Sequence, residues 1–224
     1  MIGVSPEQRS FDRPITTEGQ LFVEGRVPEM FFREMIIACG LESRIEARTF
    51  GDINKNNLET WLELFCQKAT FKEKVKRLGI VRDAESSTAD AAFRSVQAAL
   101  KTAGLHVPEW INTLTGTPLS IGVFVLPDCQ NAGMLENLCL TAIAEIEGTA
   151  STRVLPCIDA FFNCLNTQGR SPDNPVKARL AGFALACDVI DPQLGRAAQQ
   201  GVIPWAARAF EPLKVFLRAV AGEG

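Results

Sequence analysis

The sequence predicts an α/β fold with a mainly parallel sheet of four or slightly more strands, flanked by helices and followed by a C-terminal helical extension. Short, almost wholly apolar segments alternate with segments of helical periodicity over the first 133 residues. This alternation is typical of a parallel sheet that is covered on both faces. From residue 134 onward, apolar residues recur at helical spacing and no further strand is indicated.

Four segments predict the strands. They cover residues 19–25, 45–50, 76–82 and 119–126. The last of them reads LSIGVFVL and is apolar almost throughout, which favours a strand buried on both faces. We therefore expect an α/β core that spans residues 15–133.

Helices are predicted between these strands. Proline is favoured in the first turn of a helix, so Pro28 marks the start of the first one. Apolar residues repeat at helical spacing over residues 58–65 and again over 93–103. Ser87 and Asp90 have the spacing of a capping box ahead of the second of these segments.

The extension, residues 134–224, is predicted to be helical and to pack on the core as part of one structural unit. Residues 135–146 form its first helix, and Asn174 followed by proline opens a later one. The Phe-rich segment 154–165 is most simply a core helix, and any uncovered part of it would suit a dimer contact. Residues 205–220 predict a closing amphipathic helix.

Composition excludes several classes of protein. Hydrophobic residues make up 46% of the chain and charged residues 22%, so a disordered or fibrous protein is not indicated. The formal net charge of -3, without a long block of Lys and Arg, argues against a protein that coats nucleic acid through bulk charge. The seven cysteines include no pair with the two-residue gap of a zinc or redox motif, so neither is predicted.

The chain also lacks the pattern of a membrane or secreted protein. Its first residues contain no apolar signal segment, and the longest apolar run, residues 121–127, is too short to cross a bilayer. We expect a cytoplasmic protein with no membrane partner. The single histidine, His106, precedes a proline by two positions and is most simply an exposed loop residue.

Acidic residues follow three of the four predicted strands. The carboxyl ends of parallel strands meet at one edge of a sheet, so these side chains would converge on one crevice. Carboxylates gathered in this way repel one another unless a cation compensates, and Mg²⁺ or Mn²⁺ is suited to oxygen ligands. The alternative is that they are solvated loop residues. The residues concerned are Glu24, Asp83, Glu85 and Asp128.

Two short motifs carry a resemblance to a known family. The order VEG at residues 23–25, followed later by the acid-X-acid step at 83–85, resembles the toprim domain of topoisomerases, primases and the overcoming-lysogenisation-defect nucleases. The stretches 122–140 and 194–220 are similar to an uncharacterised bacterial family in the toprim-like group. The resemblance extends over roughly residues 20–220.

The resemblance implies roles for individual residues. Glu24 matches the toprim glutamate that acts as general acid or base or as a metal ligand. Asp83 matches the first aspartate of the metal-binding pair and is also implied in catalysis, while Glu85 stands where a second aspartate is usual. Asp128 and Glu136 match acids that follow the fourth strand. Together these five residues would bind Mg²⁺ or Mn²⁺.

The implied activity is divalent-metal-dependent hydrolysis of a phosphodiester, as in a nuclease. The chain contains no tyrosine, which excludes a topoisomerase mechanism through phosphotyrosine. Lys177 follows a predicted helix start and is a candidate phosphate contact, although a surface lysine is the simpler interpretation. The alternative function is a non-catalytic toprim-like module that binds a nucleotide or a protein.

Several partners are compatible with these two functions. They are nucleic acid or a nucleotide, a second copy of the chain, and a separate ATPase. Related nucleases usually carry an ATPase segment on the same chain, whereas this sequence has no P-loop pattern.

Overall fold

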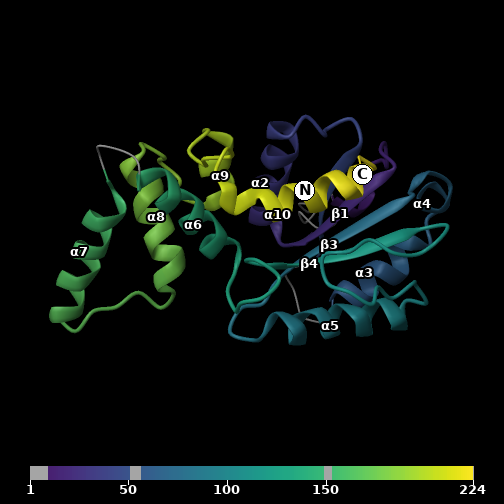
Figure 1. Cartoon of the computed structure of the whole chain (residues 1–224), viewed down its shortest axis with the longest axis horizontal. Coiled ribbons are helices and arrows are strands. Elements are labelled where there is room, and N and C mark those ends of the chain that lie inside the picture. Colours follow the sequence, from purple (N-terminus) through teal and green to yellow (C-terminus); the bar gives the residue numbers. More distant parts are fainter. Residues whose placement is uncertain (1–9, 51–56, 149–152, 224) are drawn as a thin grey trace, which may run out of the picture.

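The computed structural model describes residues 10–50, 57–148 and 153–223. Within them, four parallel strands form one sheet in the order β2-β1-β3-β4 (Figure 1). The strands are β1 (Gly19–Glu24), β2 (Ile45–Phe50), β3 (Arg77–Asp83) and β4 (Ser120–Leu126). The predicted parallel α/β fold is confirmed, and each strand begins and ends within one residue of its expected bounds.

Helices cover both faces of the sheet. One face carries α2 (Arg26–Ala38) and α10 (Glu211–Ala221), and α9 (Leu194–Gln199) packs on α2. The other carries α3 (Asn57–Cys66), α4 (Ala69–Lys74) and α5 (Ala89–Thr102). Because side chains alternate along a strand, Val23 and Val81 belong to the first core, whereas Phe22 and Ile80 belong to the second.

Helix α10 contacts the centre of the sheet directly. Gly79 of β3 and Gly122 of β4 are partners in register. A Cβ added to Gly79 would lie 2.8 Å from Cγ2 of Val220, and one added to Gly122 would lie 3.0 Å from Cε2 of Phe216. The two glycines therefore make room for the C-terminal helix, which forms part of the central core.

The remaining helices are α6 (Leu135–Glu147), α7 (Leu155–Thr167), α8 (Pro175–Ala186) and the short 3₁₀ helix η1 (Arg208–Phe210). Helices α7 and α8 project from one end of the molecule (Figure 1). The interpretation of α7 as a core helix is wrong over most of its length. Only Leu155 and Ile158 are buried in it, and Phe161 is 59% exposed, because α7 packs along α8 and leaves its other side open.

Two helix starts differ from the sequence prediction. Thr88, rather than Ser87, caps α5, since its side chain accepts a hydrogen bond of 3.1 Å from the backbone N–H of Ala91. The closing helix begins at Glu211 instead of residue 205. Pro212 lies in its first turn, where proline forfeits no helical hydrogen bond.

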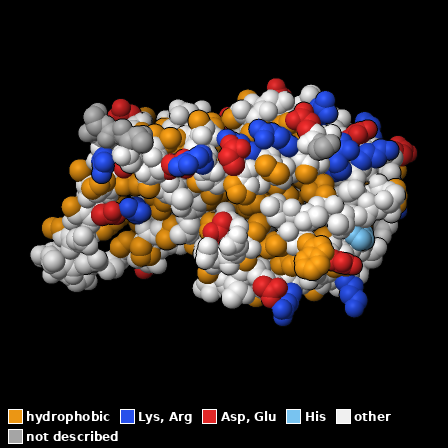
Figure 2. Space-filling view, viewed as in Figure 1, with side chains coloured by type: hydrophobic (Ala, Val, Ile, Leu, Met, Phe, Trp, Pro, Cys, Tyr) orange, Lys and Arg blue, Asp and Glu red, His pale blue; other side chains and the backbone are white. Residues whose placement is uncertain are grey.

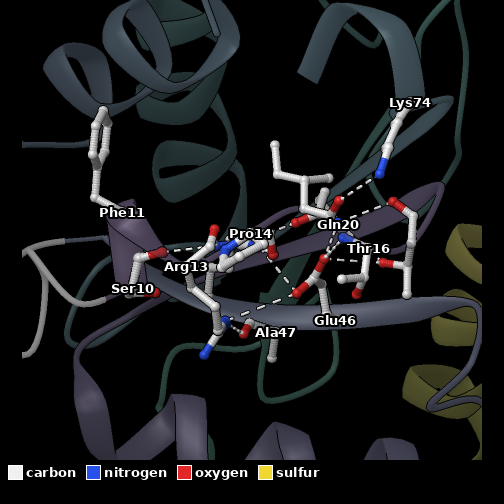
Figure 3. A network of polar contacts seen from close by, with 12 residues as sticks. Ser10, Phe11, Arg13, Pro14, Thr16, Gln20, Glu46, Ala47 and Lys74 are labelled. Atoms are coloured by element: carbon white, nitrogen blue, oxygen red, sulfur yellow. Dashed lines mark hydrogen bonds and ion pairs between the residues drawn. The ribbon is translucent and has the colours of Figure 1, made fainter. Parts of the chain in front are cut away.

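The segment before β1 is held by a buried arginine. The guanidinium of Arg48, on edge strand β2, is fully buried and donates hydrogen bonds to the backbone carbonyls of Ser10, Arg13 and Pro14 at 2.7 to 2.9 Å. It also pairs with Glu46 at 3.0 Å. Figure 3 shows this polar network. The N-terminal segment therefore lies against the edge of the sheet, which protects that edge.

No helix in the described part of the chain combines the length and the apolar character that crossing a bilayer requires.

Candidate functional site

A cleft of about 540 Å³ lies at the carboxyl ends of β1 and β3. These strands are neighbours, but the helices that follow them cover opposite faces: α2 follows β1, and α5 follows β3. The connections that leave the two strands therefore go to opposite faces of the sheet. Open α/β sheets bind their ligands at such a point. The starts of α2 and α6 and parts of α8 and α9 complete the walls.

The structure brings together five of the residues singled out in the sequence. All five line this cleft, although they come from four different elements and from the turn after β3. They are Glu24, Asp83, Glu85, Glu136 and Lys177.

Asp128 is not among the residues that line the cleft. Its carboxylate accepts hydrogen bonds from the backbone N–H groups of Gln130 and Asn131 at 3.0 and 2.8 Å, and from the side-chain amide of Asn131 at 2.7 Å. Slight burial raises the pKa of Asp128, but these hydrogen bonds outweigh it and hold the pKa below its usual range. The carboxylate stabilises the turn that follows β4.

Asp83 is the buried acid of the cleft. Side chains two apart on a strand share a face, so Asp83 lies on the same side of the sheet as the core residue Val81. Its Oδ1 accepts a hydrogen bond of 2.9 Å from the backbone N–H of Leu135, in the first turn of α6. An N–H at this position has no partner within its own helix, so Asp83 supplies the missing acceptor.

The environment of Asp83 favours its uncharged form. Burial raises its pKa to about 7, and the negative charges of Glu136 and Glu24 act in the same direction. The hydrogen bond from Leu135 and the positive charge of Lys177 lower the pKa but do not cancel the rise. A cation bound beside Asp83 would therefore relieve an electrostatic cost that is present in the cleft.

Glu24 lies at the rim, with its side chain 37% exposed. Its Oε2 is 3.6 Å from Nε of Arg82, the neighbouring residue on β3. This ion pair joins the ends of β1 and β3 and leaves the Glu24 carboxylate within reach of solvent.

Glu136 and Lys177 face each other across the cleft. Oε1 of Glu136 is 3.9 Å from Nζ of Lys177, and the Glu136 side chain is only 13% exposed. The lysine is placed by Asn174, whose side chain caps α8 by accepting a hydrogen bond of 2.9 Å from the Lys177 backbone N–H.

Glu85 lies in a strained turn. Its φ of 53° is in the left-handed region, which is uncommon for a residue other than glycine. Its backbone N–H donates to the carbonyl of Gly133 at 2.6 Å. This bond ties the turn after β3 to the loop that leads into α6, and so places two walls of the cleft together.

Sequence reasoning missed the opposite wall. Leu180 and Ala181 of α8, and Pro192, Gln193 and Leu194 at the start of α9, also line the cleft. Leu194 begins the stretch 194–220 noted above, but no motif marks any of these residues as part of a site, because they reach the cleft only through the packing of the extension. Arg26 was missed as well, although its position two residues after Glu24 was a usable signal.

The acidic side chains of the cleft could supply some, but not all, of the ligands of a divalent ion. Among the residues that the structure describes, no three His, Cys, Asp or Glu side chains are grouped so that they could hold a metal by themselves. Mg²⁺ in phosphoryl-transfer sites is commonly held by one or two carboxylates, with water and substrate phosphate completing its shell. Four carboxylates around one cleft fit this shared mode of binding and do not form a complete protein cage.

The fold and the cleft define an α/β protein with an acidic site between β1 and β3, where the helices that follow the two strands pack on opposite faces of the sheet. Over residues 18–222, the chain matches the family described as "Protein of unknown function (DUF3226)", and it belongs to that family. No curated protein and no solved structure gives a significant match.

Proposed function

We propose that this protein is a toprim-like phosphodiester hydrolase that depends on Mg²⁺ or Mn²⁺. The observation that carries the proposal is the buried Asp83, which shares its cleft with Glu24 and Glu136 at the carboxyl ends of two parallel strands. Such a cluster is costly without a counter-charge, and a divalent ion supplies one.

Asp83 and Glu136 are the residues best suited to hold the ion. Among the charged neighbours of Asp83, Glu136 has the largest effect in raising its pKa, which means that their charges interact strongly. Glu85 lines the same cleft and adds to its negative charge. When bound, the ion would polarise the phosphoryl oxygen and neutralise charge that develops on it.

Lys177 and Arg26 are the two basic residues of the cleft and would bind the phosphate oxygens. Glu136 lies 3.9 Å from the Lys177 ammonium, so a phosphate would compete with Glu136 for that ammonium and would leave Glu136 available to the ion. Binding of the phosphate and binding of the ion are therefore expected to reinforce each other.

Glu24 is assigned the proton transfer. Its carboxylate is 37% exposed and paired with Arg82, which supports this role because water can reach it. Glu24 accepts a proton as the water oxygen forms its bond to phosphorus, and the bond from phosphorus to the leaving alcohol breaks. The same proton then passes to the departing alcohol oxygen.

The experiment is a hydrolysis assay with bis(p-nitrophenyl) phosphate and with short single-stranded DNA, in Mg²⁺, Mn²⁺ or EDTA. Glu24→Gln should lose about 100-fold in kcat and retain its Mg²⁺ affinity, because a proton carrier and not a ligand is removed. The matched control is Glu63→Gln, an exposed glutamate of α3 on the other face of the sheet, which should leave kcat unchanged.

Equal activity of wild type and Glu24→Gln would contradict the proposed mechanism. Metal-dependent binding of a nucleotide without turnover of any substrate would instead support the alternative, a non-catalytic toprim-like module.

A further inference from the structure

We infer that the cleft takes a small phosphate ester with an aliphatic body, rather than a strand of nucleic acid. This inference rests on the proposed function and specifies its substrate class.

The two walls of the cleft differ in chemistry. The strand ends and α6 contribute the carboxylates. The facing wall comes from three helices and carries aliphatic side chains beside two basic ones. The aliphatic residues are Val27 and Pro28 on α2, Leu180 and Ala181 on α8, and Leu194 on α9, and the basic ones are Arg26 on α2 and Lys177 on α8. A ligand that spans both walls needs a charged group at one end and an apolar group at the other, because burying apolar surface against the helices is favourable.

The size of the cleft points to a small molecule. A volume of about 540 Å³ lies within the usual range for small-ligand sites. Its aliphatic wall is also fixed in place, since α9 packs closely on α2: a Cβ added to Gly195 would lie 2.8 Å from Cβ of Met30. The wall is therefore a preformed surface.

Among the described residues that line the cleft, we do not find the features with which proteins bind nucleic acid strands. Proteins of that kind offer aromatic side chains for base stacking and a continuous positive groove for the backbone. No aromatic side chain is among the described residues that line the cleft. On the face shown in Figure 2, Lys and Arg side chains lie among Asp and Glu side chains.

The charged residues of the cleft favour a phosphate that binds together with a cation. Two basic residues, Lys177 and Arg26, face four carboxylates, so the cleft as a whole repels a free anion. A phosphate ester and a divalent ion together match both sets of charges. We therefore expect the ester to bind in Mg²⁺ and to bind weakly in EDTA.

The test is calorimetric titration of the full chain in Mg²⁺ with four probes: inorganic phosphate, dimethyl phosphate, dibutyl phosphate and a short single-stranded DNA. Dibutyl phosphate should bind at least about tenfold more tightly than dimethyl phosphate, because its extra methylenes contact the aliphatic wall. It should also bind more tightly than the DNA.

Two variants of α8 test whether the preference for dibutyl phosphate depends on the aliphatic wall. Ala181→Leu adds bulk to the aliphatic wall and should weaken dibutyl phosphate by about tenfold while changing dimethyl phosphate by less than about twofold. The same substitution at Ala186, which is exposed on α8 and does not line the cleft, should change neither affinity.

Equal affinities for dimethyl and dibutyl phosphate would overturn the inference, as would tighter binding of the DNA. If metal-dependent hydrolysis of bis(p-nitrophenyl) phosphate persists in either case, the proposed function stands and only the substrate class is wrong. Selective binding of dibutyl phosphate without hydrolysis of any ester would support the inference and contradict the hydrolase.

Discussion

Asp83 and Leu135 are joined by a hydrogen bond of 2.9 Å, donated by the Leu135 backbone N–H to Oδ1 of Asp83. The bond fixes the end of β3 to the start of α6, across 52 positions of sequence. Asp83 therefore has two roles: it caps a helix, and it is the buried acid of the cleft. The following predictions separate these roles from each other and from the packing that supports them.

The stability of the metal-free protein should fall as pH rises through the titration of Asp83. The ordinary pKa is 3.8 and the folded-state pKa is about 7, so between these values the folded state binds a proton that the unfolded state has released. The folded protein thus loses up to about 4 kcal/mol of relative stability between about pH 4 and pH 7. Urea unfolding in EDTA at several pH values measures the unfolding free energy. Asp83→Asn is the reference, because it has no carboxyl group at this position to titrate.

Asp83→Asn keeps an oxygen acceptor for Leu135 and removes the charge, so it should be more stable than wild type at about pH 8 and similar at about pH 4. A constant difference at every pH would contradict the raised pKa. Asp83→Ala removes the cap as well and should cost about 1 kcal/mol relative to the Asn variant.

Divalent ions should stabilise the wild type and not Asp83→Asn. At an ion concentration of about 100 times Kd, Tm of the wild type should rise by about 5 °C or more. Asp128→Asn is the informative control, because Asp128 lies in a turn and does not line the cleft. It should retain the full Tm increase in Mg²⁺ even if its turn is weakened. An Asp128→Asn protein that no longer responds to Mg²⁺ would place Asp128 at the ion.

Gly79→Ala should destabilise the protein by about 1 to 3 kcal/mol, because the new Cβ would overlap Cγ2 of Val220 at 2.8 Å. Denaturant unfolding gives the free energy. Combining this change with Val220→Ala should cost less than the sum of the two single changes, since the second substitution removes one of the overlapping atoms. Additive effects would show that the close approach of α10 to the sheet is not responsible.

Arg48→Met should cost about 3 kcal/mol or more of unfolding free energy. The change removes the buried cation that pairs with Glu46, and it removes the donor to three backbone carbonyls of the N-terminal segment. The control is Arg94→Met, since Arg94 forms an exposed ion pair with Asp90 and its loss should change stability by less than about 1 kcal/mol. Faster proteolysis near Arg13 in Arg48→Met alone would locate the loss in that segment.

Much of the fold follows from local patterns. A buried strand leaves a short apolar run, and a helix leaves apolar residues at helical spacing, so both can be recognised within a window of a few residues. Residues 45–50, for example, form β2 with the predicted bounds. The grouping of Glu24, Asp83 and Glu85 was accessible for a related reason, since parallel strands place their carboxyl ends on one edge.

Other features of the site depend on contacts between distant segments. Asp128 follows a strand just as Glu24 does, but its side chain is taken up by hydrogen bonds to its own turn. Helix α7 has the apolar pattern of a core helix, yet Phe161 remains exposed because no described element covers that side.

The amino-acid sequence thus specified the four strands, most of the longer helices, the parallel sheet and the acids at the strand ends, because each of these leaves a pattern in neighbouring residues. The short helices α4, α9 and η1 were not predicted. The aliphatic wall of the cleft, the cap that Asp83 provides to α6 and the raised pKa of that acid were decided by the tertiary structure. Burial and charge interaction depend on which distant segments meet, and α8 and α9 reach the end of β3 only when the extension packs against the sheet.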